Sequence, residues 1–313
     1  MALKQIKNKI ISTKKTGKVT KAMESVSAVK MRKSQIRAFE SRPYVHAAMR
    51  ILSRLAQTSE VQQHPLSLPR SVSKKLVIIV TSDKGLAGSV NSAVLKQVEQ
   101  LRAEGDIFDV VAIGRKALEF ARRGKLVVIA DYTNVSDNVT LADVYKMSEV
   151  VMQAFTGGNE YGKVEIVYQN FISTFEQSPT KRQVLPLDPA EVNYIMRGIK
   201  PKHGKFSEEV LAPDAMVDYE IEPSASAVLD VLIPQLVQIL IFHALMESKA
   251  SEHSARMVAM KNATDKSREV VKALTLVYNK ERQAAITAEV SEITGGMEAL
   301  KKWYGTICFV GLQ

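Results

Sequence analysis

The segment most suited to chemistry is the loop Thr81–Ser89, TSDKGLAGS, which follows an apolar run and precedes a helical pattern. Phosphate groups commonly bind where a strand gives way to the amino end of a helix, because backbone N–H groups point outward there. The glycine spacing fits neither G-x-G-x-x-G nor G-x-x-x-x-G-K-[ST], and Lys84 precedes the glycines instead of closing the loop. We therefore predict a structural turn, in which Asp83 and either Ser89 or Asn91 cap the turn and the helix, and no bound cofactor.

Side chains that could bind a metal ion or act as nucleophiles are scattered along the chain. The five histidines stand at positions 46, 64, 203, 243 and 253, and Cys308 is the only cysteine. His243 and His253 share a predicted helix, but they are ten residues apart with no carboxylate at ligand spacing. The sequence also has no G-x-S-x-G elbow. We predict no metal site and no catalytic residue.

Positive charge is concentrated at the start of the chain. Residues 1–42 contain twelve Lys or Arg against only Glu24 and Glu40, whereas the remaining residues contain 31 bases and 31 acids. A basic segment attracts acidic partners of several kinds: nucleic-acid phosphates, an anionic membrane surface or an acidic protein loop. Charge alone does not choose among these partners.

Three further features bear on the compartment. A single cysteine excludes an internal disulfide and fits a reducing cytoplasmic compartment. The first ten residues, MALKQIKNKI, lack the continuous apolar region of a secretory signal. The apolar stretch 227–246 contains Asp230, and a central Asp costs about 2.5–3.5 kcal/mol on insertion, so we interpret this stretch as a buried helix.

The middle of the chain has the pattern of an α/β domain. Short β-branched runs alternate with helical patterns, which indicates a mostly parallel, Rossmann-like sheet with right-handed crossovers. An antiparallel hairpin or edge strands are expected over 171–187. The predicted strands cover 76–81, 110–113, 126–130 and 164–168, and the predicted helices cover 91–103, 115–123 and 140–155.

Both ends of the chain predict long helices that pair with each other. In the N-terminal helix, apolar residues recur at steps of three and four, with a phase slip at Gly17. In the C-terminal helix, a stripe with the same steps continues for about ten heptads until Gly295-Gly296, where we expect the helix to end. The N-terminal stripe consists of Leu3, Ile6, Ile10, Val19, Ala22 or Met23, Val26 and Val29; the C-terminal stripe includes Met260, Thr264, Ser267, Val271, Leu274 and Tyr278.

These patterns divide the chain into five segments and predict an α/β fold combined with a coiled coil. The long N- and C-terminal helices are antiparallel and enclose the α/β domain. The segments are an N-terminal helix at 1–59, an α/β domain at 75–187, an irregular connection at 188–223, a C-terminal helix at 224–294 and a tail at 295–313.

Several short motifs occur in an order that is similar to one protein family. They are VTKAM at 19–23, SDKGL at 82–86, ARMVAMK at 255–261, ATD at 263–265 and LVYNK at 276–280. With the basic helix first and the heptad helix last, the chain resembles the gamma subunits of bacterial F-type ATP synthases from about residue 3 to residue 300.

The resemblance implies a central-stalk rotor subunit with no active site of its own. Its paired helices would stand inside a hexameric ring of alpha and beta subunits, and its α/β domain would sit beside the epsilon subunit and the ring of c subunits. Proton-driven rotation would then bias the beta subunits toward ATP synthesis by conformational contact. The expected location is the cytoplasmic face of the bacterial inner membrane, with no membrane span in this chain.

The family's contact residues map onto individual positions. Met23 matches a residue facing the acidic lever loop of beta. Arg282 and Gln283 match the pair that meets the catch loop of beta, and Arg256 and Thr287 are further candidates for beta contacts. Near the c ring and epsilon, the corresponding positions are Tyr219 and Glu222.

The sequence departs from the family pattern at Gly17, at Ile221 and in the tail 301–313, and it lacks the paired cysteines of the chloroplast type. Two rival interpretations remain open on the residues alone. A basic coiled-coil protein that binds nucleic acid would bind DNA with a steep salt dependence. A Rossmann-like enzyme would need the 75–187 region to bind a nucleotide.

Overall fold

The computed structural model describes residues 3–40, 43, 47–48, 51, 64–158, 160–188, 222 and 224–310, with side chains described as far as residue 300 apart from Phe39. These residues form two compact units, one of Met1–Met23 with Met260–Gln313 and one of Glu24–Ala259. Helices α1 (Leu3–Glu40) and α8 (Ala225–Val310) contribute to both units, and all the other elements lie in the second.

The second unit contains a five-stranded sheet in the order β3-β2-β1-β4-β5, in which β1 to β4 are parallel and β5 runs antiparallel to β4. Five of the six residues of β1 are buried, as expected of a central parallel strand covered on both faces. The strands are β1 (Lys75–Val80), β2 (Phe108–Ile113), β3 (Val128–Tyr132), β4 (Lys163–Phe171) and β5 (Gln177–Leu185), and the connecting helices are α4 (Val90–Ala103), α5 (Arg115–Arg123) and α6 (Leu141–Thr156).

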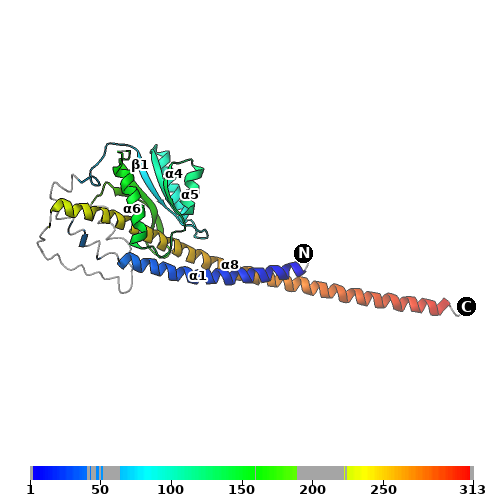
Figure 1. Cartoon of the computed structure of the whole chain (residues 1–313). Coiled ribbons are helices and arrows are strands. Elements are labelled where there is room, and N and C mark those ends of the chain that lie inside the picture. The colour runs from blue at the N-terminus through cyan, green and yellow to red at the C-terminus, as the bar shows by residue number, and fades with distance from the viewer. Residues whose placement is uncertain are drawn as a thin grey trace. The chain divides into compact units, whose positions relative to one another are not determined.

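The strand order decides which helix covers which face. The chain moves outward from β1 to β2 and β3, and then crosses back to β4 on the other side of β1. Since parallel crossovers are right-handed, this reversal puts α4 and α5 on one face and α6 on the other (Figure 1). Residues 225–250 of α8 pack on the face covered by α6, where Leu229, Ile233, Leu236 and Ile241 are fully buried.

The observed architecture confirms the predicted fold class, a mostly parallel α/β sheet combined with long N- and C-terminal helices. Each predicted strand and helix of the α/β region is present, with ends shifted by a few residues. The range 171–187, where a hairpin or edge strands were expected, contains one edge strand, β5, which pairs antiparallel with β4. Register and end points depend on neighbouring strands, which explains the small shifts.

One predicted helix end is wrong, because α8 continues through Gly295 and Gly296 to Val310. A glycine ends a helix where the chain gains contacts by turning away. Here no atom lies within 4 Å of a Cβ built at either glycine, so no contact favours a turn. The following residues, Met297 to Lys302, are good helix formers, and they offset a cost of about 1 kcal/mol for each glycine.

Helix α8 also includes a stretch that is long and apolar enough to cross a membrane, but half of that stretch is buried inside the protein. Much of the stretch 227–246 forms the contact with the sheet, and Phe242 and Met246 belong to the core. This burial agrees with the interpretation of the stretch as a buried helix.

Candidate functional site

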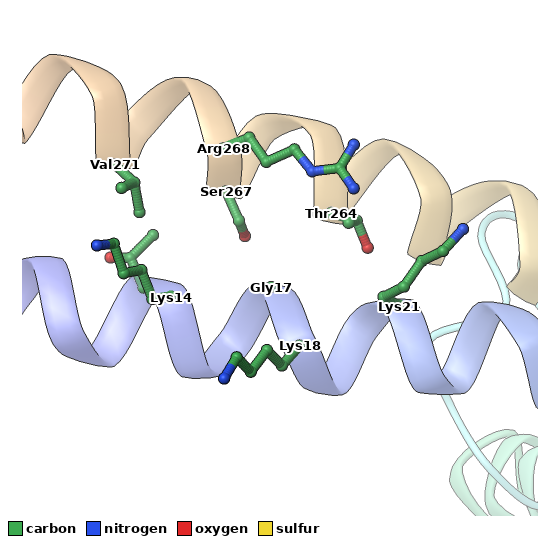
Figure 2. Close-up of a pocket in the computed structure, with 9 residues that line it drawn as sticks. Lys14, Gly17, Lys18, Lys21, Thr264, Ser267, Arg268 and Val271 are labelled. Atoms are coloured by element: carbon green, nitrogen blue, oxygen red, sulfur yellow. The ribbon is translucent and has the colours of Figure 1, made fainter.

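In the unit formed by Met1–Met23 and Met260–Gln313, α1 and α8 meet along a seam of small and polar side chains. The hydroxyls of Thr20 and Thr264 are 2.7 Å apart and both residues are buried. A Cβ built at Gly17 would lie 3.3 Å from the Cβ of Ser267, so the two backbones approach closely there. Thr264 and Ser267 point from α8 toward α1, with Gly17 facing them (Figure 2). These pairs make the two helices antiparallel.

The seam corrects the predicted N-terminal stripe. Val19, Val26 and Val29 are exposed, whereas the buried positions after Gly17 are Thr20 in this unit and Ser27, Ser34 and Ala38 in the other. No phase slip occurs at Gly17, since Ile6, Ile10, Thr13, Gly17 and Thr20 follow regular steps of three and four. Because α8 presents small polar residues, close approach selects small partners on α1 rather than β-branched valines.

The same register shows where α1 stops covering α8. With Gly17 opposite Ser267 and Thr20 opposite Thr264, Leu3 falls opposite Glu281. Every described side chain from Asn279 to Leu300 is exposed. Arg282, Gln283 and Thr287 therefore project from a part of α8 that no other described segment of this chain covers. The Thr287 hydroxyl donates to the carbonyl of Gln283, one turn earlier on the same helix.

Cations surround the seam. Residues 3–23 contain seven lysines and no acidic residue, and all seven side chains are exposed. A groove of about 510 Å³ runs along the seam, with Lys14, Lys18, Lys21 and Arg268 among its lining residues. Met23, at the end of this segment, is half-buried. The arrangement can accept an acidic segment.

In the unit Glu24–Ala259, α8 crosses the carboxyl edge of the sheet, the edge at which open α/β sheets bind their ligands. Three α8 side chains donate hydrogen bonds to backbone carbonyls of the loops and strand at this edge. Lys249 Nζ bonds Val135 O at 3.0 Å, Ser251 Oγ bonds Gln169 O at 3.1 Å and Ser254 Oγ bonds Thr174 O at 2.6 Å. Part of the crevice is therefore occupied by a helix that belongs to the chain itself, and a cavity of about 240 Å³ remains between this helix and the loops.

Arg256 extends this attachment. Its guanidinium is buried, bonds Glu252 at 2.7 Å, and donates to the carbonyls of Lys84 and Gly85 at 3.4 and 3.3 Å. All of these partners lie in its own unit. Its geometry is that of a residue holding the loop after β1 against α8, which differs from the exposed positions of Arg282 and Gln283.

The loop Thr81–Ser89 has a structural role, as predicted for Asp83 and Asn91. One carboxylate oxygen of Asp83 accepts the backbone N–H groups of Arg115 and Asn134, at 3.0 and 2.9 Å. The amino end of α5, where a phosphate could have bound, is thus occupied by a side chain. Asn91 Oδ1 accepts from Ser82 N at 2.9 Å. Ser89 precedes α4 but makes no side-chain capping bond, so that alternative is wrong.

Buried polar groups also join α8 to the sheet deeper in the core. His243 Nδ1 and Glu247 Oε1 lie 3.6 Å apart on successive turns, and both side chains are almost fully buried. Burial raises the pKa of Tyr168 in β4 well above its ordinary value, and the Glu247 carboxylate raises it further. Such a network restricts the rotation and the position of α8 on the sheet, because its hydrogen bonds are directional.

Of the two residues predicted to lie near the c ring and epsilon, one is described by the structure. Glu222 is exposed and lines a shallow groove with Val231 and Gln235 at the start of α8. Tyr219 lies outside the described residues.

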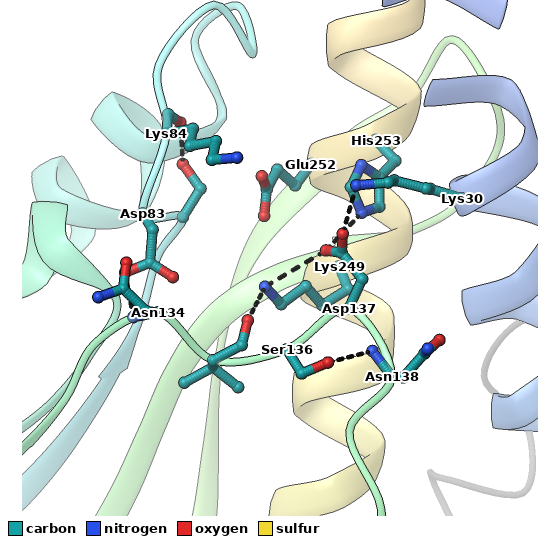
Figure 3. A network of polar contacts seen from close by, with 12 residues as sticks. Lys30, Asp83, Lys84, Asn134, Ser136, Asp137, Asn138, Lys249, Glu252 and His253 are labelled. Atoms are coloured by element: carbon teal, nitrogen blue, oxygen red, sulfur yellow. Dashed lines mark hydrogen bonds and ion pairs between the residues drawn. The ribbon is translucent and has the colours of Figure 1, made fainter. Parts of the chain in front are cut away.

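Sequence reasoning missed Asp137 and Lys30. Asp137, in the loop after β3, contacts Lys30 of α1 at 2.6 Å and His253 of α8 at 3.0 Å (Figure 3). One available signal was the place of Asp137 just beyond a predicted strand, where functional side chains of α/β folds gather. Lys30 carried no signal, since it is one of many lysines in a basic helix.

Comparison with known proteins extends over almost the whole chain. A family model described as ATP synthase matches residues 2–300. Two curated relatives, the ATP synthase gamma chains of Stenotrophomonas maltophilia strains K279a and R551-3, are each 39% identical over 302 residues, which cover 95% of this chain and 99% of the relative.

Solved structures share the fold. A chain of the Tetrahymena thermophila mitochondrial ATP synthase central stalk and c-ring is 24% identical, with a TM-score of 0.57, over 78% of this chain and 99% of that one. A chain of the Euglena gracilis mitochondrial ATP synthase is 18% identical, with a TM-score of 0.62, over 95% of this chain and 94% of that one.

Proposed function

Since this chain belongs to the ATP synthase gamma-chain family, we propose that it is the central-stalk rotor subunit, which couples proton-driven rotation of a c ring to ATP synthesis. Its partners are the alpha and beta subunits around the helices, and the epsilon subunit and the c ring at the α/β domain. The complex works at the membrane, on its cytoplasmic face.

The observation that carries this proposal is the division of α8 into an anchored part and an uncovered part. Residues 249–256 bond to backbone carbonyls at the carboxyl edge of the sheet, whereas residues 279–300 are exposed throughout. A subunit that conveys rotation needs a part held by the driving domain and a part free to contact other subunits. Both are present on one helix.

Coupling by contact requires that the rotor bind the alternative conformations of each beta subunit with different free energies. On the uncovered part of α8, Arg282 and Gln283 would contact the catch loop of beta, and Thr287 would contribute one turn further on. A guanidinium suits this role because it binds carboxylates through two parallel hydrogen bonds. Rotation moves this pair from one beta subunit to the next.

The basic α1 segment suits a second contact with beta. Its seven exposed lysines would attract the acidic lever loop, with Met23 packing beside that loop. Glu222 and Tyr219 would contact the c ring and epsilon. We assign Arg256 mainly to attaching the β1 loop to α8, given its buried partners in this chain.

In this proposal the chain contributes no catalytic group. ATP is made at sites on beta and its alpha neighbour, and this subunit changes the relative free energies of their conformations. The carboxyl edge of the sheet supports this division of labour, because α8 takes up part of the crevice in which a Rossmann-like enzyme would bind its nucleotide.

The test is Arg282→Ala combined with Gln283→Ala in the assembled complex, measured as ATP-driven proton pumping in membrane vesicles per ATP hydrolysed. A hydrogen bond from a charged group contributes about 1.5–3 kcal/mol, so its loss changes the balance between two beta conformations by roughly tenfold or more. We expect less pumping per ATP at unchanged assembly.

The matched control is Lys272→Ala with Asn262→Ala, which removes one cation and one amide from exposed positions of the same helix outside the uncovered part. This control should pump like the wild type. Equal pumping by both double variants would exclude the assignment of Arg282 and Gln283. Failure of the wild-type chain to co-purify with alpha and beta would exclude the rotor function itself.

A further inference from the structure

One carboxylate in the α/β domain is bonded by both long helices. Asp137, in the loop between β3 and α6, lies 2.6 Å from Nζ of Lys30 in α1, 3.0 Å from Nε2 of His253 and 3.7 Å from Nζ of Lys249, both in α8. All four residues belong to the unit Glu24–Ala259. In Figure 3 the side chains from the two helices converge on the Asp137 carboxylate.

The loop that carries Asp137 is held in place on both sides of this residue. Asn134 N donates to Asp83 at 2.9 Å, Lys249 Nζ donates to Val135 O at 3.0 Å, and Asn138 N donates to Ser136 Oγ at 3.0 Å. Asp137 is therefore fixed relative to the carboxyl edge of the sheet. A helix bonded to Asp137 is positioned by the sheet, rather than by a loosely attached loop.

The cations that contact Asp137 depend on it as their acidic partner. Lys249 and His253 are nearly buried, and Lys30, Lys84 and Arg256 line the same cavity of about 240 Å³. The acids facing this cavity are Asp83, Glu252 and Asp137, and the first two already bond backbone N–H groups or Arg256. The hydrogen bonds from His253 and Lys30, together with the nearby charge of Lys249, hold the pKa of Asp137 far below its ordinary value.

Each helix has further contacts besides Asp137. Helix α8 is attached through Ser251, Ser254 and Arg256. Helix α1 buries Ser27, Ser34 and Ala38 in this unit, and Met31 packs against the core. The Lys30–Asp137 contact adds a directional, charge-assisted bond between α1 and the domain.

We infer that Asp137 is a positioning residue for rotary coupling, through which the α/β domain turns α1 and α8 together. This inference rests on the proposed rotor function. Asp137 acts through Lys30 on α1 and through Lys249 and His253 on α8, and it contacts no nucleotide. Without it, the domain would hold both helices less firmly when the rotor works against a load.

The experiment compares Asp137→Asn, Asp137→Glu and Lys30→Met in the assembled membrane complex. Asp137→Asn keeps the side-chain shape and removes the charge, whereas Lys30→Met removes only the cation contributed by α1. The matched control is Asp131→Asn, an exposed aspartate in β3 of the same sheet. Each complex is measured for ATP hydrolysis, for proton pumping per ATP hydrolysed, and for amide hydrogen exchange in residues 24–40 and 245–259.

We expect Asp137→Asn to hydrolyse ATP near the wild-type rate while pumping clearly fewer protons per ATP against a gradient, and Asp137→Glu to recover part of that loss. Exchange in residues 24–40 should become about two- to fivefold faster in both Asp137→Asn and Lys30→Met, because a partly exposed charge-assisted bond is lost. Only Asp137→Asn should also speed exchange in residues 245–259. A variant that combines Asp137→Asn with Lys30→Met should be no worse than Asp137→Asn, and Asp131→Asn should resemble the wild type.

Normal pumping per ATP in both Asp137→Asn and Lys30→Met, in a complex whose wild type pumps, would overturn the inference and leave the rotor function standing. A loss of assembly and of ATP hydrolysis in Asp137→Asn, together with normal pumping and exchange in Lys30→Met, would also overturn it, since Asp137 would then be needed only for folding. A wild-type chain that does not assemble with alpha and beta would instead remove the function on which the inference rests.

Discussion

The contact between Thr20 and Thr264 gives a quantitative test of how the two helices hold each other. The perturbation is replacement of each threonine by valine, alone and together, because valine keeps the shape and removes the hydroxyl. The two oxygens are 2.7 Å apart in a buried position, which is a good hydrogen-bond distance.

The magnitude follows from what each hydroxyl does besides this contact. Thr264 Oγ1 also bonds the carbonyl of Met260 at 2.8 Å, and Thr20 Oγ1 bonds that of Gly17 at 3.1 Å. A single substitution therefore leaves the remaining hydroxyl with an acceptor in its own helix. Each single variant should lose the net value of one neutral hydrogen bond, about 1 kcal/mol. The double variant loses the same inter-helix bond and the two bonds within the helices, which have little net value, so its cost should also be about 1 kcal/mol or less.

The assay is native-state amide hydrogen exchange in residues 13–23 and 260–271 of the full chain, which reports the local free energy of opening. We expect exchange about fivefold faster in each single variant, since 1 kcal/mol corresponds to roughly that factor. The double variant should exchange no faster than the singles, which gives a coupling energy of about 1 kcal/mol.

A control cycle uses Thr16→Val with Thr264→Val. Thr16 is exposed on α1, and its hydroxyl bonds only the carbonyl of Ser12 among the described contacts, so the two changes should add independently. Additive costs in the Thr20 and Thr264 cycle, equal to those of the control, would refute the contact between the two hydroxyls and the register based on it.

Three further predictions concern the α/β domain. Gly114→Ala should lower the free energy of unfolding, measured in urea, by at least about 3 kcal/mol. Gly114 has φ 91°, and an added Cβ would lie 2.1 Å from the Thr81 carbonyl oxygen. The control, Gly124→Ala, should cost less than about 1 kcal/mol. Thr140→Ala should cost about 1 kcal/mol in thermal unfolding, because it removes the capping box of α6 formed with Asp143, and Ser136→Ala should leave α6 unchanged. Because the pKa of Asp137 is lowered in the folded protein, its contribution to stability should be complete at neutral pH and should disappear as the pH falls below about 3.8. In unfolding experiments at different pH values, the difference in stability between the wild type and Asp137→Asn should therefore shrink over that acid range.

The α/β region could be predicted closely because its signals are local. Apolar runs such as 76–80 and 110–113 form strands that are buried on both faces, and the glycines and polar residues between them mark the turns. The heptad stripe of α8 was equally clear, and Met260, Thr264 and Ser267 are buried as its period requires. In each case the pattern within one segment was sufficient.

The face of α1 could not be predicted in the same way, because it depends on a partner more than 240 residues away. Val19, Val26 and Val29 form an apolar stripe by themselves, but the small side chains of α8 select the face with Thr20 and Ser27. The role of Asp137 could not be predicted for the same reason. A lone aspartate in a polar loop becomes a point of attachment only when two distant helices bring cations to it. Long-range contacts of this kind leave no periodic signal in one sequence.

The position of α8 on the sheet connects the absence of predicted chemistry with the proposed function. In an open α/β sheet, loops at the carboxyl edge present backbone groups to a ligand. Here the carbonyls of Lys84, Val135 and Thr174 accept hydrogen bonds from α8 instead. A ligand in such a crevice exchanges with solvent, whereas a helix of the same chain stays in place and extends beyond it. The features that make this fold a binding site, several loops converging on one edge, therefore make it a rigid attachment for a rotor helix.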